Sequence, residues 1–300
     1  MTLPFVLTLV ARRDATTLTR AAIEEARELV SGQAAIVLSD GEAADIFCPA
    51  PSTAFSDSNP GLPAIRARFA DRAIDVVLTR SRGRRKGLLV ADMDSTIVAS
   101  ETLDDLAARA GVGARVAEIT RRSMNGEIDF ANALRERVGL LKGLDAAHLD
   151  ATWAQTRLTG GARTLVATMR AHNALTALVS GGFTWFTARV AEACGFEVHH
   201  ANQLGIEAGR LTGKVAQPIL GRAAKLDSLR SLAAARSLQP RATLAVGDGA
   251  NDLDMLREAG LGIAFHAKPI VAEQTTNRID HADLRALLFA QGYRAADFRE

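Results

Sequence analysis

The chain of 300 residues is longer than an average single domain, and its apolar fraction of 48% is enough to bury a sizeable core. Lysine and arginine (36) nearly balance aspartate and glutamate (34), and no stretch interleaves basic with aromatic residues, which argues against a nucleic-acid-binding enzyme. The two cysteines have no histidine or cysteine neighbours at ligand spacing, which argues against a disulfide framework or a zinc site and favours a reducing compartment.

The N-terminus predicts a folded element and not a targeting signal. No basic region precedes the apolar run at 1–10, and no small-residue cleavage site follows it. No apolar stretch of the chain reaches membrane-spanning length. We therefore expect a cytoplasmic protein with no membrane partner.

The start of the chain alternates strand and helix patterns. Residues 3–10 predict a buried strand, and 16–30 an amphipathic helix that opens with threonine and acidic residues. Two short apolar runs follow, separated by Asp40 and Gly41, a pair typical of a hairpin turn.

The first unit ends with a second helix and a strand. A loop rich in Pro, Ser and Asn at 49–63 precedes a helix at 63–72 and a strand at 73–80. The resulting order β-α-β-β-α-β is typical of a ferredoxin-like sandwich. We expect residues 1–80 to form this domain, and the basic run Arg80–Lys86 to be a solvated linker after it.

Beyond this run the pattern changes to short, continuous apolar segments. Residues 87–94, 174–182 and 242–249 each predict a strand buried on both faces of a parallel sheet, and each ends in a polar or glycine-rich turn. Such turns converge on one site in doubly wound sheets. The interval 102–172 exceeds the roughly 10–12 residues that a crossover needs. We expect an α/β core over 81–300 with a helical cap inserted at about 102–172.

The first of these turns carries two aspartates one residue apart. Asp92, when ionised, is suited to in-line attack on a phosphoryl group, which would give an aspartyl-phosphate. Asp94 is suited to protonate the leaving alkoxide and later to accept a proton from water. Taken alone, such a pair is as often an exposed turn. The clustered carboxylates would repel a phosphate without a divalent cation, and Mg²⁺ is the expected ion.

The second turn and a later helix supply groups that suit a phosphate. Ser180 offers a hydroxyl, and Gly181 an unhindered backbone N–H group. Lys225 lies on a predicted helix and could stabilise the equatorial oxygens of the transferred group. A helix lysine alone is more often a surface residue.

The third turn completes the expected metal site. Asp248 joins Asp92 and Asp94 as a ligand, with Asp252 supporting them from the following helix. Several acidic groups at the end of a buried strand are costly without a partner, which favours a functional site over a plain turn.

The order of these features resembles the haloacid-dehalogenase-like hydrolase superfamily. Asp-x-Asp-x-Thr, Ser-Gly, Lys and Gly-Asp-x-x-x-Asp follow one another between residue 87 and about residue 275. The set is specific although each member is not. Dehalogenases of this superfamily lack the second aspartate, so the presence of Asp94 implies phosphoryl chemistry.

Two longer segments resemble the phosphoserine phosphatase family within that superfamily: DMDSTIVASETLDDLA and MNGEIDFANALRERVGLLKGL. This resemblance implies hydrolysis of phosphoserine in serine biosynthesis. It also implies that Glu101 meets the substrate ammonium group, Arg137 pairs with the carboxylate, and Asn251 lies near the phosphate. Phe130 and Met124 would wall the pocket. An intrahelical partner is the simpler alternative for Arg137.

Other functions share parts of this pattern. A phosphotransferase that uses a hydroxyl acceptor such as homoserine would contain every residue named above. A non-catalytic amino-acid sensor on the same fold is disfavoured by the intact chemical set, and a nucleic-acid regulator would rest on the basic run alone. The resemblance also suggests an ACT-like regulatory module at 1–80; its ligand and a role in forming a homodimer stay open.

Overall fold

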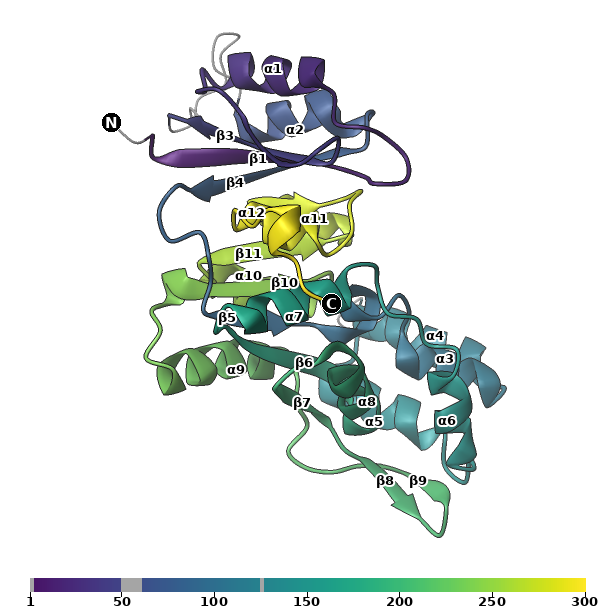
Figure 1. Ribbon diagram of the computed structural model, residues 1–300. Coiled ribbons are helices and arrows are strands. Elements are labelled where there is room, and N and C mark those ends of the chain that lie inside the picture. Colours follow the sequence, from purple (N-terminus) through teal and green to yellow (C-terminus); the bar gives the residue numbers. More distant parts are fainter. Residues whose placement is uncertain (1–2, 50–60, 125–126) are drawn as a thin grey trace.

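The structure, a computed structural model, describes residues 3–49, 61–124 and 127–300. Figure 1 shows three parts in a row: an antiparallel sheet with two helices, a parallel sheet flanked by helices, and a helical cap. Within the described residues, no helix is long and apolar enough to cross a membrane. Both cysteines are buried and free.

The N-terminal part is a four-stranded antiparallel sheet in the order β2-β3-β1-β4. Its elements are β1 (Phe5–Ala11), α1 (Arg20–Leu29), β2 (Ile36–Ser39), β3 (Ala43–Cys48), α2 (Leu62–Ala70) and β4 (Ile74–Arg80). Thr19 caps α1, because its side-chain oxygen accepts a hydrogen bond from Ala22 N at 3.2 Å. Leu9 and Phe69 belong to the core between the sheet and the two helices. The predicted loop at 49–63 lies almost entirely outside the described residues.

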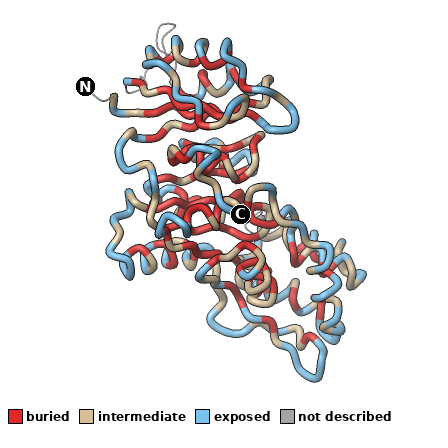
Figure 2. Tube along the Cα trace, in the orientation of Figure 1, coloured by how far each residue is buried: buried red, intermediate tan, exposed pale blue. Residues whose placement is uncertain are grey.

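The middle part is a six-stranded parallel sheet in the order β12-β11-β10-β5-β6-β7. Its strands are β5 (Leu88–Ala91), β6 (Leu175–Phe183), β7 (Val198–Asn202), β10 (Thr243–Gly247), β11 (Leu261–Phe265) and β12 (Asn277–Ile279). Its helices are α7 (Ala162–Ala171), α8 (Thr184–Cys194), α9 (Arg222–Ala235), α10 (Leu253–Glu258), α11 (Pro269–Gln274) and α12 (Ala286–Ala290). The three apolar runs predicted as strands are β6, β5 and β10, which lie side by side and are buried over most of their length (Figure 2). The parallel α/β core is therefore confirmed.

The N-terminal sheet is covered on its second face as well. Val10 of β1 and Val77 of β4 belong to the large core that also contains α12, which lies against both strands (Figure 1). A two-layer sandwich would leave this face open to water. Here the C-terminal end of the parallel-sheet part closes it.

Buried polar groups fasten the two sheets together. The carboxylate of Asp75 in β4 accepts hydrogen bonds from three consecutive backbone N–H groups at 280–282, at 2.7, 3.1 and 2.7 Å. The side-chain amide of Asn277 in β12 pairs with both the N–H and the carbonyl of Leu78, at 2.9 and 3.0 Å. These groups satisfy one another inside the junction, where a missing partner would be costly.

The basic run between the two parts is only partly the solvated linker that the sequence predicts, because Arg82 and Arg85 are exposed but Arg84 turns inward. The Arg84 side chain is only 10% exposed and forms an ion pair with Asp45, which is 4% exposed. Arg84 also donates to Thr8 Oγ1 at 3.1 Å. Arg85 lies over the ring of Tyr293, 4.2 Å from its centroid. The planar guanidinium group lets Arg84 donate to a carboxylate, a hydroxyl and backbone carbonyls at once. Arg84 therefore links the N-terminal sheet to α12.

The cap contains α3 (Thr102–Arg109), α4 (Gly113–Met124), α5 (Phe130–Gly139) and α6 (Ala147–Trp153). The chain leaves and re-enters the core through two neighbouring connections, in which the Ala99 and Thr159 N–H groups donate to the carbonyls of Arg157 and Ile97, both at 2.9 Å. The predicted cap boundary at residue 172 is too late. Helix α7 packs on β6 and α8, because a parallel connection from β5 to β6 needs a crossover helix against the sheet.

A β-hairpin that follows β7 also contacts the cap. The hairpin of β8 (Leu204–Glu207) and β9 (Arg210–Val215) lies against α5. Leu211 accepts a hydrogen bond from Gly143 N and donates one to the carbonyl of Leu144, both at 2.8 Å. The sequence did not predict this hairpin, since its strands are short and Leu211 is one of few buried apolar residues in it.

Candidate active site

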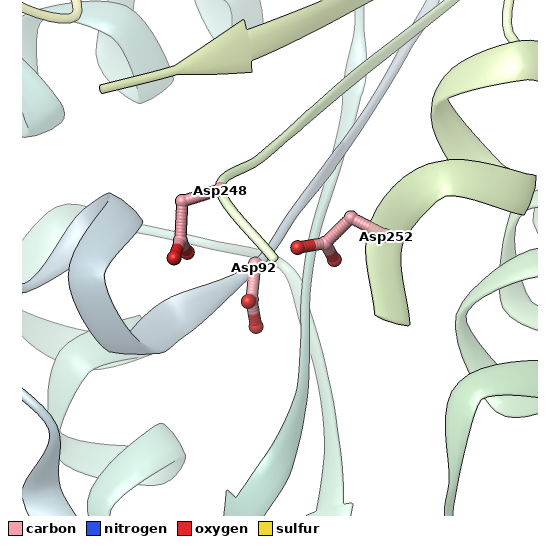
Figure 3. A group of neighbouring side chains, drawn as sticks. All are labelled: Asp92, Asp248 and Asp252. Carbon is pink, nitrogen blue, oxygen red and sulfur yellow. The ribbon is translucent and has the colours of Figure 1, made fainter. Parts of the chain in front are cut away.

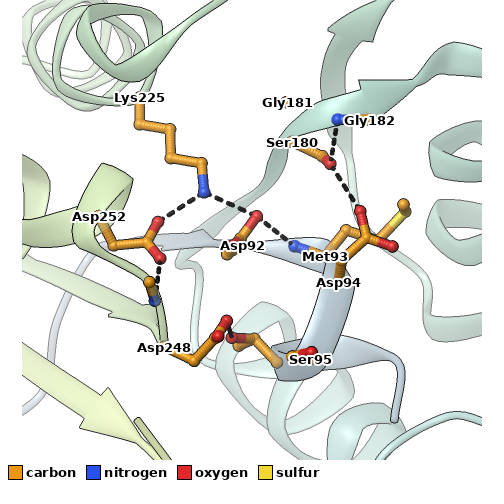
Figure 4. A network of polar contacts seen from close by, with 12 residues as sticks. Asp92, Met93, Asp94, Ser95, Ser180, Gly181, Gly182, Lys225, Asp248 and Asp252 are labelled. Atoms are coloured by element: carbon orange, nitrogen blue, oxygen red, sulfur yellow. Dashed lines mark hydrogen bonds and ion pairs between the residues drawn. The ribbon is translucent and has the colours of Figure 1, made fainter. Parts of the chain in front are cut away.

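The carboxyl ends of the three central strands bring the predicted turns together (Figure 4). Asp92 directly follows β5, Ser180–Gly182 lie in the last part of β6, and Asp248 directly follows β10. Lys225 reaches the same place from the first turn of α9. This convergence follows from the sheet order, because β5 lies between β6 and β10.

Three carboxylates form one buried cluster (Figure 3). Asp92, Asp248 and Asp252 each place an oxygen within 4.8 Å of the others. Their exposed fractions are 6, 5 and 0%. Burial and the neighbouring Asp252 carboxylate raise the pKa of Asp248 to about 6, and the same two causes raise the pKa of Asp92 well above its usual range. The cluster therefore has more negative charge than its surroundings can solvate.

Lys225 supplies one compensating charge. Its Nζ lies 2.7 Å from Asp92 Oδ1 and 2.6 Å from Asp252 Oδ1 (Figure 4). Burial acts to lower the pKa of Lys225, but the carboxylates of Asp252 and Asp92 outweigh it and the pKa is raised. The side chain is therefore a buried ammonium group that links the turn after β5 to the turn after β10.

The donor set fits a hard divalent cation. One ammonium group faces three carboxylates, and carboxylate oxygens are the ligands that such ions prefer. The two oxygens of Asp252 are already engaged, one by Lys225 and one by Gly249 N at 3.0 Å. This leaves Asp92 and Asp248 as the residues best placed to hold an ion, with Asp252 holding Lys225.

The Asp94 side chain is directed away from this cluster. Its Oδ1 accepts from Thr102 N at 2.9 Å, and its Oδ2 accepts from Ser180 Oγ at 3.3 Å. The Asp94 carboxylate lies outside the group of three clustered carboxylates, and its assignment as a metal ligand stays a prediction. Burial, followed by the nearby Glu101 carboxylate, raises the pKa of Asp94 to about 6. A carboxyl group with this pKa can exchange a proton near neutral pH.

The glycines after Ser180 leave no room for side chains. A Cβ atom at Gly181 would lie 3.0 Å from the Phe130 ring, and one at Gly182 would lie 3.0 Å from Asp94 Oδ2. Gly182 N donates to Ser180 Oγ at 2.8 Å. The turn thus places a hydroxyl and glycine backbone within reach of the Asp92–Asp94 segment, and Phe130 brings the cap into contact with it.

Two residues expected at the amino-acid end of a substrate, Glu101 and Arg137, lie near each other and near Asp94. Glu101 accepts a hydrogen bond from Ser95 Oγ at 2.9 Å, at the start of the cap. Arg137 is half-buried; burial lowers the pKa of its guanidinium, while the carboxylates of Asp104 and Glu101 act in the opposite direction. Among the described residues Arg137 has no ion pair, and its Nε donates to the carbonyl of Ala133 at 3.4 Å.

Asn251 and Met124 are the remaining residues that the sequence predicts at the site. Asn251 follows Asp248 in the third turn, half-buried beside Gly249. Met124 is the last residue of α4, and its side chain lies outside the described part of the chain.

Sequence reasoning assigned no function to two residues that contact Asp248. Thr96 Oγ1 donates to Asp248 Oδ1 at 3.1 Å, and Lys268 N donates to the carbonyl of Asp248 at 3.2 Å. Thr96 is the threonine of the Asp-x-Asp-x-Thr motif, and its place in that motif could have identified it as a site residue. Lys268 lies in residues 266–269 (HAKP), a segment that carries no chemical signal by itself.

The comparison with protein families agrees with the fold and with these turns. The family described as haloacid dehalogenase-like hydrolase matches residues 89–257, which contain all three turns and Lys225. The chain belongs to this haloacid dehalogenase-like hydrolase family.

Within the family, the chain is similar to curated phosphoserine phosphatases. It is 46% identical over 199 residues to that of Streptococcus thermophilus, covering 66% of this chain and 93% of the relative. It is 42% identical over 238 residues to that of Streptomyces coelicolor, covering 79% of this chain and 58% of the relative. The chain thus spans little more than half the length of the Streptomyces coelicolor protein.

Solved structures give the same class. A haloacid dehalogenase family hydrolase from Salmonella enterica superposes with a TM-score of 0.84 at 27% identity, over 95% of this chain and 97% of its own. A phospho-aspartyl intermediate analogue of phosphoserine phosphatase superposes with a TM-score of 0.64 at 38% identity, over 68% of this chain and 98% of its own.

Proposed function

We propose that this protein hydrolyses O-phospho-L-serine to L-serine and inorganic phosphate, with Mg²⁺ held by Asp92 and Asp248. The observation that carries the proposal is the position of Asp92, 2.7 Å from the Lys225 ammonium group and inside the carboxylate cluster. The similarity to curated phosphoserine phosphatases supports the choice of substrate. The phospho-aspartyl analogue solved for a phosphoserine phosphatase supports an aspartyl-phosphate intermediate.

In the first half-reaction, an Asp92 oxygen attacks phosphorus and the bond from phosphorus to the serine oxygen breaks. Asp94 gives its proton to the departing alkoxide, and its raised pKa of about 6 supports this function. In the second half-reaction, Asp94 takes a proton from the water whose oxygen attacks phosphorus; the bond from phosphorus to the Asp92 oxygen breaks, phosphate leaves and the Asp92 carboxylate is regenerated. A bound Mg²⁺ would neutralise charge on the phosphate oxygens and on the carboxylates around them.

The remaining groups stabilise the transferred phosphoryl group. Lys225 is a permanent cation beside the attacking oxygen, and Ser180 and Gly181 offer a hydroxyl and a backbone N–H at the facing turn. Asn251, in the third turn, is proposed to contact the phosphate as well. All these groups are held before the substrate arrives, so little reorganisation is needed during the reaction.

The substrate's amino-acid end is proposed to lie under the cap. Arg137 would pair with the carboxylate and Glu101 with the ammonium group, since each has the opposite charge. The absence of an ion pair at Arg137 among the described residues supports this, because its fork is left for a ligand. Phe130 and Met124 would form the apolar wall.

We also propose that residues 1–80 are a ferredoxin-like, ACT-like regulatory domain and that 81–300 form the phosphatase domain. The order β-α-β-β-α-β and the antiparallel sheet with α1 and α2 on one face support this division. A cytoplasmic location and assembly as a homodimer complete the proposal.

The test is a phosphate-release screen on the purified full chain. Phosphoserine, phosphothreonine, phosphoethanolamine and sugar phosphates are compared with and without Mg²⁺. We expect phosphoserine to give the highest kcat/KM and chelation to abolish turnover. Preference for a sugar phosphate would overturn the substrate. Phosphate release that falls when homoserine is added, with a phosphorylated acceptor in its place, would identify a phosphotransferase instead.

A further inference from the structure

One buried side chain joins two segments of the active site without belonging to any of its motifs. Asn202, the last residue of β7, is 2% exposed. Its Nδ2 donates to the carbonyls of Gly181 and Leu220, at 2.9 and 3.2 Å, and its Oδ1 accepts from Leu220 N at 2.7 Å. The amide therefore has every atom engaged with the backbone of two other segments.

These contacts replace backbone pairing that the sheet lacks at this point. β6 and β7 pair in register through Val179, and the register shifts before Phe183 pairs with Asn202. The irregular stretch is Ser180–Gly182, the turn proposed to bind phosphate. A side-chain amide has the same donor and acceptor as a peptide group, so Asn202 can fill the gap in the ladder.

The bond to Gly181 fixes one peptide group from both ends. The carbonyl of Gly181 and the N–H of Gly182 belong to the same peptide plane. Asn202 holds the carbonyl, and Ser180 Oγ accepts from the N–H at 2.8 Å. Ser180 Oγ in turn faces Asp94 Oδ2 at 3.3 Å. Glycine pairs rotate easily, so without Asn202 this peptide would be held at its N–H end alone, by Ser180 Oγ.

The bonds to Leu220 fix the other segment. Gly221 follows Leu220 and is the N-cap residue of α9, which carries Lys225 in its first turn. A Cβ atom at Gly221 would lie 3.4 Å from the Phe130 ring, which also contacts Gly181. Asn202 thus sets the spacing between the two glycine segments under Phe130, and between the Ser180 turn and the helix of Lys225.

We propose that Asn202 is a positioning residue for phosphoryl transfer: its side-chain amide orients the Gly181–Gly182 peptide and fixes it relative to the start of α9. The inference deepens the proposed function and rests on it. A displacement of about 1 Å at reacting groups lowers rates by about 100-fold, so loss of this amide has a measurable effect on kcat.

The test uses Asn202→Asp, which keeps the shape but replaces the donating group, and Asn202→Ala in case the first variant folds poorly. Steady-state kinetics with Mg²⁺ are measured on phosphoserine and on p-nitrophenyl phosphate. We expect kcat to fall by about 10- to 100-fold on both substrates, because the defect lies at the phosphate they share, with a smaller change in KM. Hydrogen exchange at the backbone of 180–183 is expected to become faster.

The matched controls are Asn277→Asp and Asn277→Ala. Asn277 is also a buried amide that pairs with the N–H and carbonyl of one residue, but it lies in the junction with the N-terminal sheet. Its variants are expected to lose stability and to keep kcat within about two-fold. A kcat in the Asn202 variants as high as in the Asn277 variants, or unchanged exchange at 180–183, would overturn the proposal. The exchange readout does not depend on which phosphomonoester is the substrate.

Discussion

The parallel sheet has a neighbour at each end, and the two junctions are made of different contacts. Toward the N-terminal sheet, the junction contains buried charges and amides, among them Asp75, Arg84 and Asn277, together with an apolar layer on α12. Toward the cap, the contacts are fewer. The two connecting segments pair through backbone hydrogen bonds, and the Phe130 ring packs against Gly181 and Gly221. The first junction is held by buried polar pairs and an apolar layer, whereas the second has few contacts and lies beside the proposed substrate site.

Asp92→Asn is expected to have the largest effect and to leave both junctions unchanged. It replaces the attacking carboxylate with an amide of the same shape, and turnover should fall by at least about 1,000-fold. The measurement is phosphate release, with circular dichroism to verify folding. Activity near that of the wild type would rule out Asp92 as the nucleophile.

Arg84→Ala breaks the N-terminal junction. It leaves the buried Asp45 carboxylate without its partner, and the free energy of unfolding should fall by about 3–5 kcal/mol. Denaturant unfolding measures this, and the kcat of the protein that remains folded should not change. Arg82→Ala, at an exposed position of the same run, is the control and should change stability by less than about 0.5 kcal/mol. Equal losses in the two variants would mean that Arg84 does not fasten the junction.

Arg137→Ala tests the cap side. Loss of a charged hydrogen-bonding partner for the substrate carboxylate is expected to lower kcat/KM for phosphoserine by about 10- to 100-fold. The kcat/KM for p-nitrophenyl phosphate, which has no carboxylate, should stay near the wild-type value, as should the melting temperature. Equal losses on the two substrates would remove Arg137 from carboxylate recognition.

The smallest expected effect concerns the cation and pH. Because the folded state raises the pKa of Asp248 to about 6, from an ordinary value near 3.8, its contribution favours folding at low pH and is lost as pH rises through this range. Mg²⁺ binds the ionised form and should restore about 2–4 °C of melting temperature at pH 7.5 and little at pH 5. Thermal unfolding with and without a chelator measures the difference. An equal gain in Asp248→Asn would show that the ion binds elsewhere.

The parallel core and its turns could be predicted because their signal is local. Apolar runs that end in Asp92, Ser180 and Asp248 identify buried strands, and the rule that ligands bind at the carboxyl ends of such strands brings the turns together. Which carboxylates share the cluster could not be predicted in this way. Asp94 is two residues beyond Asp92, yet hydrogen bonds from Thr102 and Ser180 hold its carboxylate outside the cluster.

The junctions could not be predicted because their partners are distant in sequence. Arg84 lies in a run that is typical of an exposed linker, but Asp45, Thr8 and carbonyls of α12 hold its side chain at 10% exposure. Asn202 has no motif around it, and its importance depends on an irregularity in the neighbouring strand. The cap boundary was misplaced for a related reason, since α7 has the same amphipathic pattern whether it packs on the cap or on the sheet.

The covering of both faces of the N-terminal sheet has a consequence for how the chain unfolds. The sheet shares a hydrophobic core with α12, and the N–H groups at 280–282 have their partner in β4. Loss of either part exposes apolar surface and unpaired polar groups of the other, so the two should melt in a single cooperative transition. We therefore expect that residues 1–80 cannot be removed without loss of stability, and that a chain beginning at β5 would present an uncovered apolar face prone to aggregation.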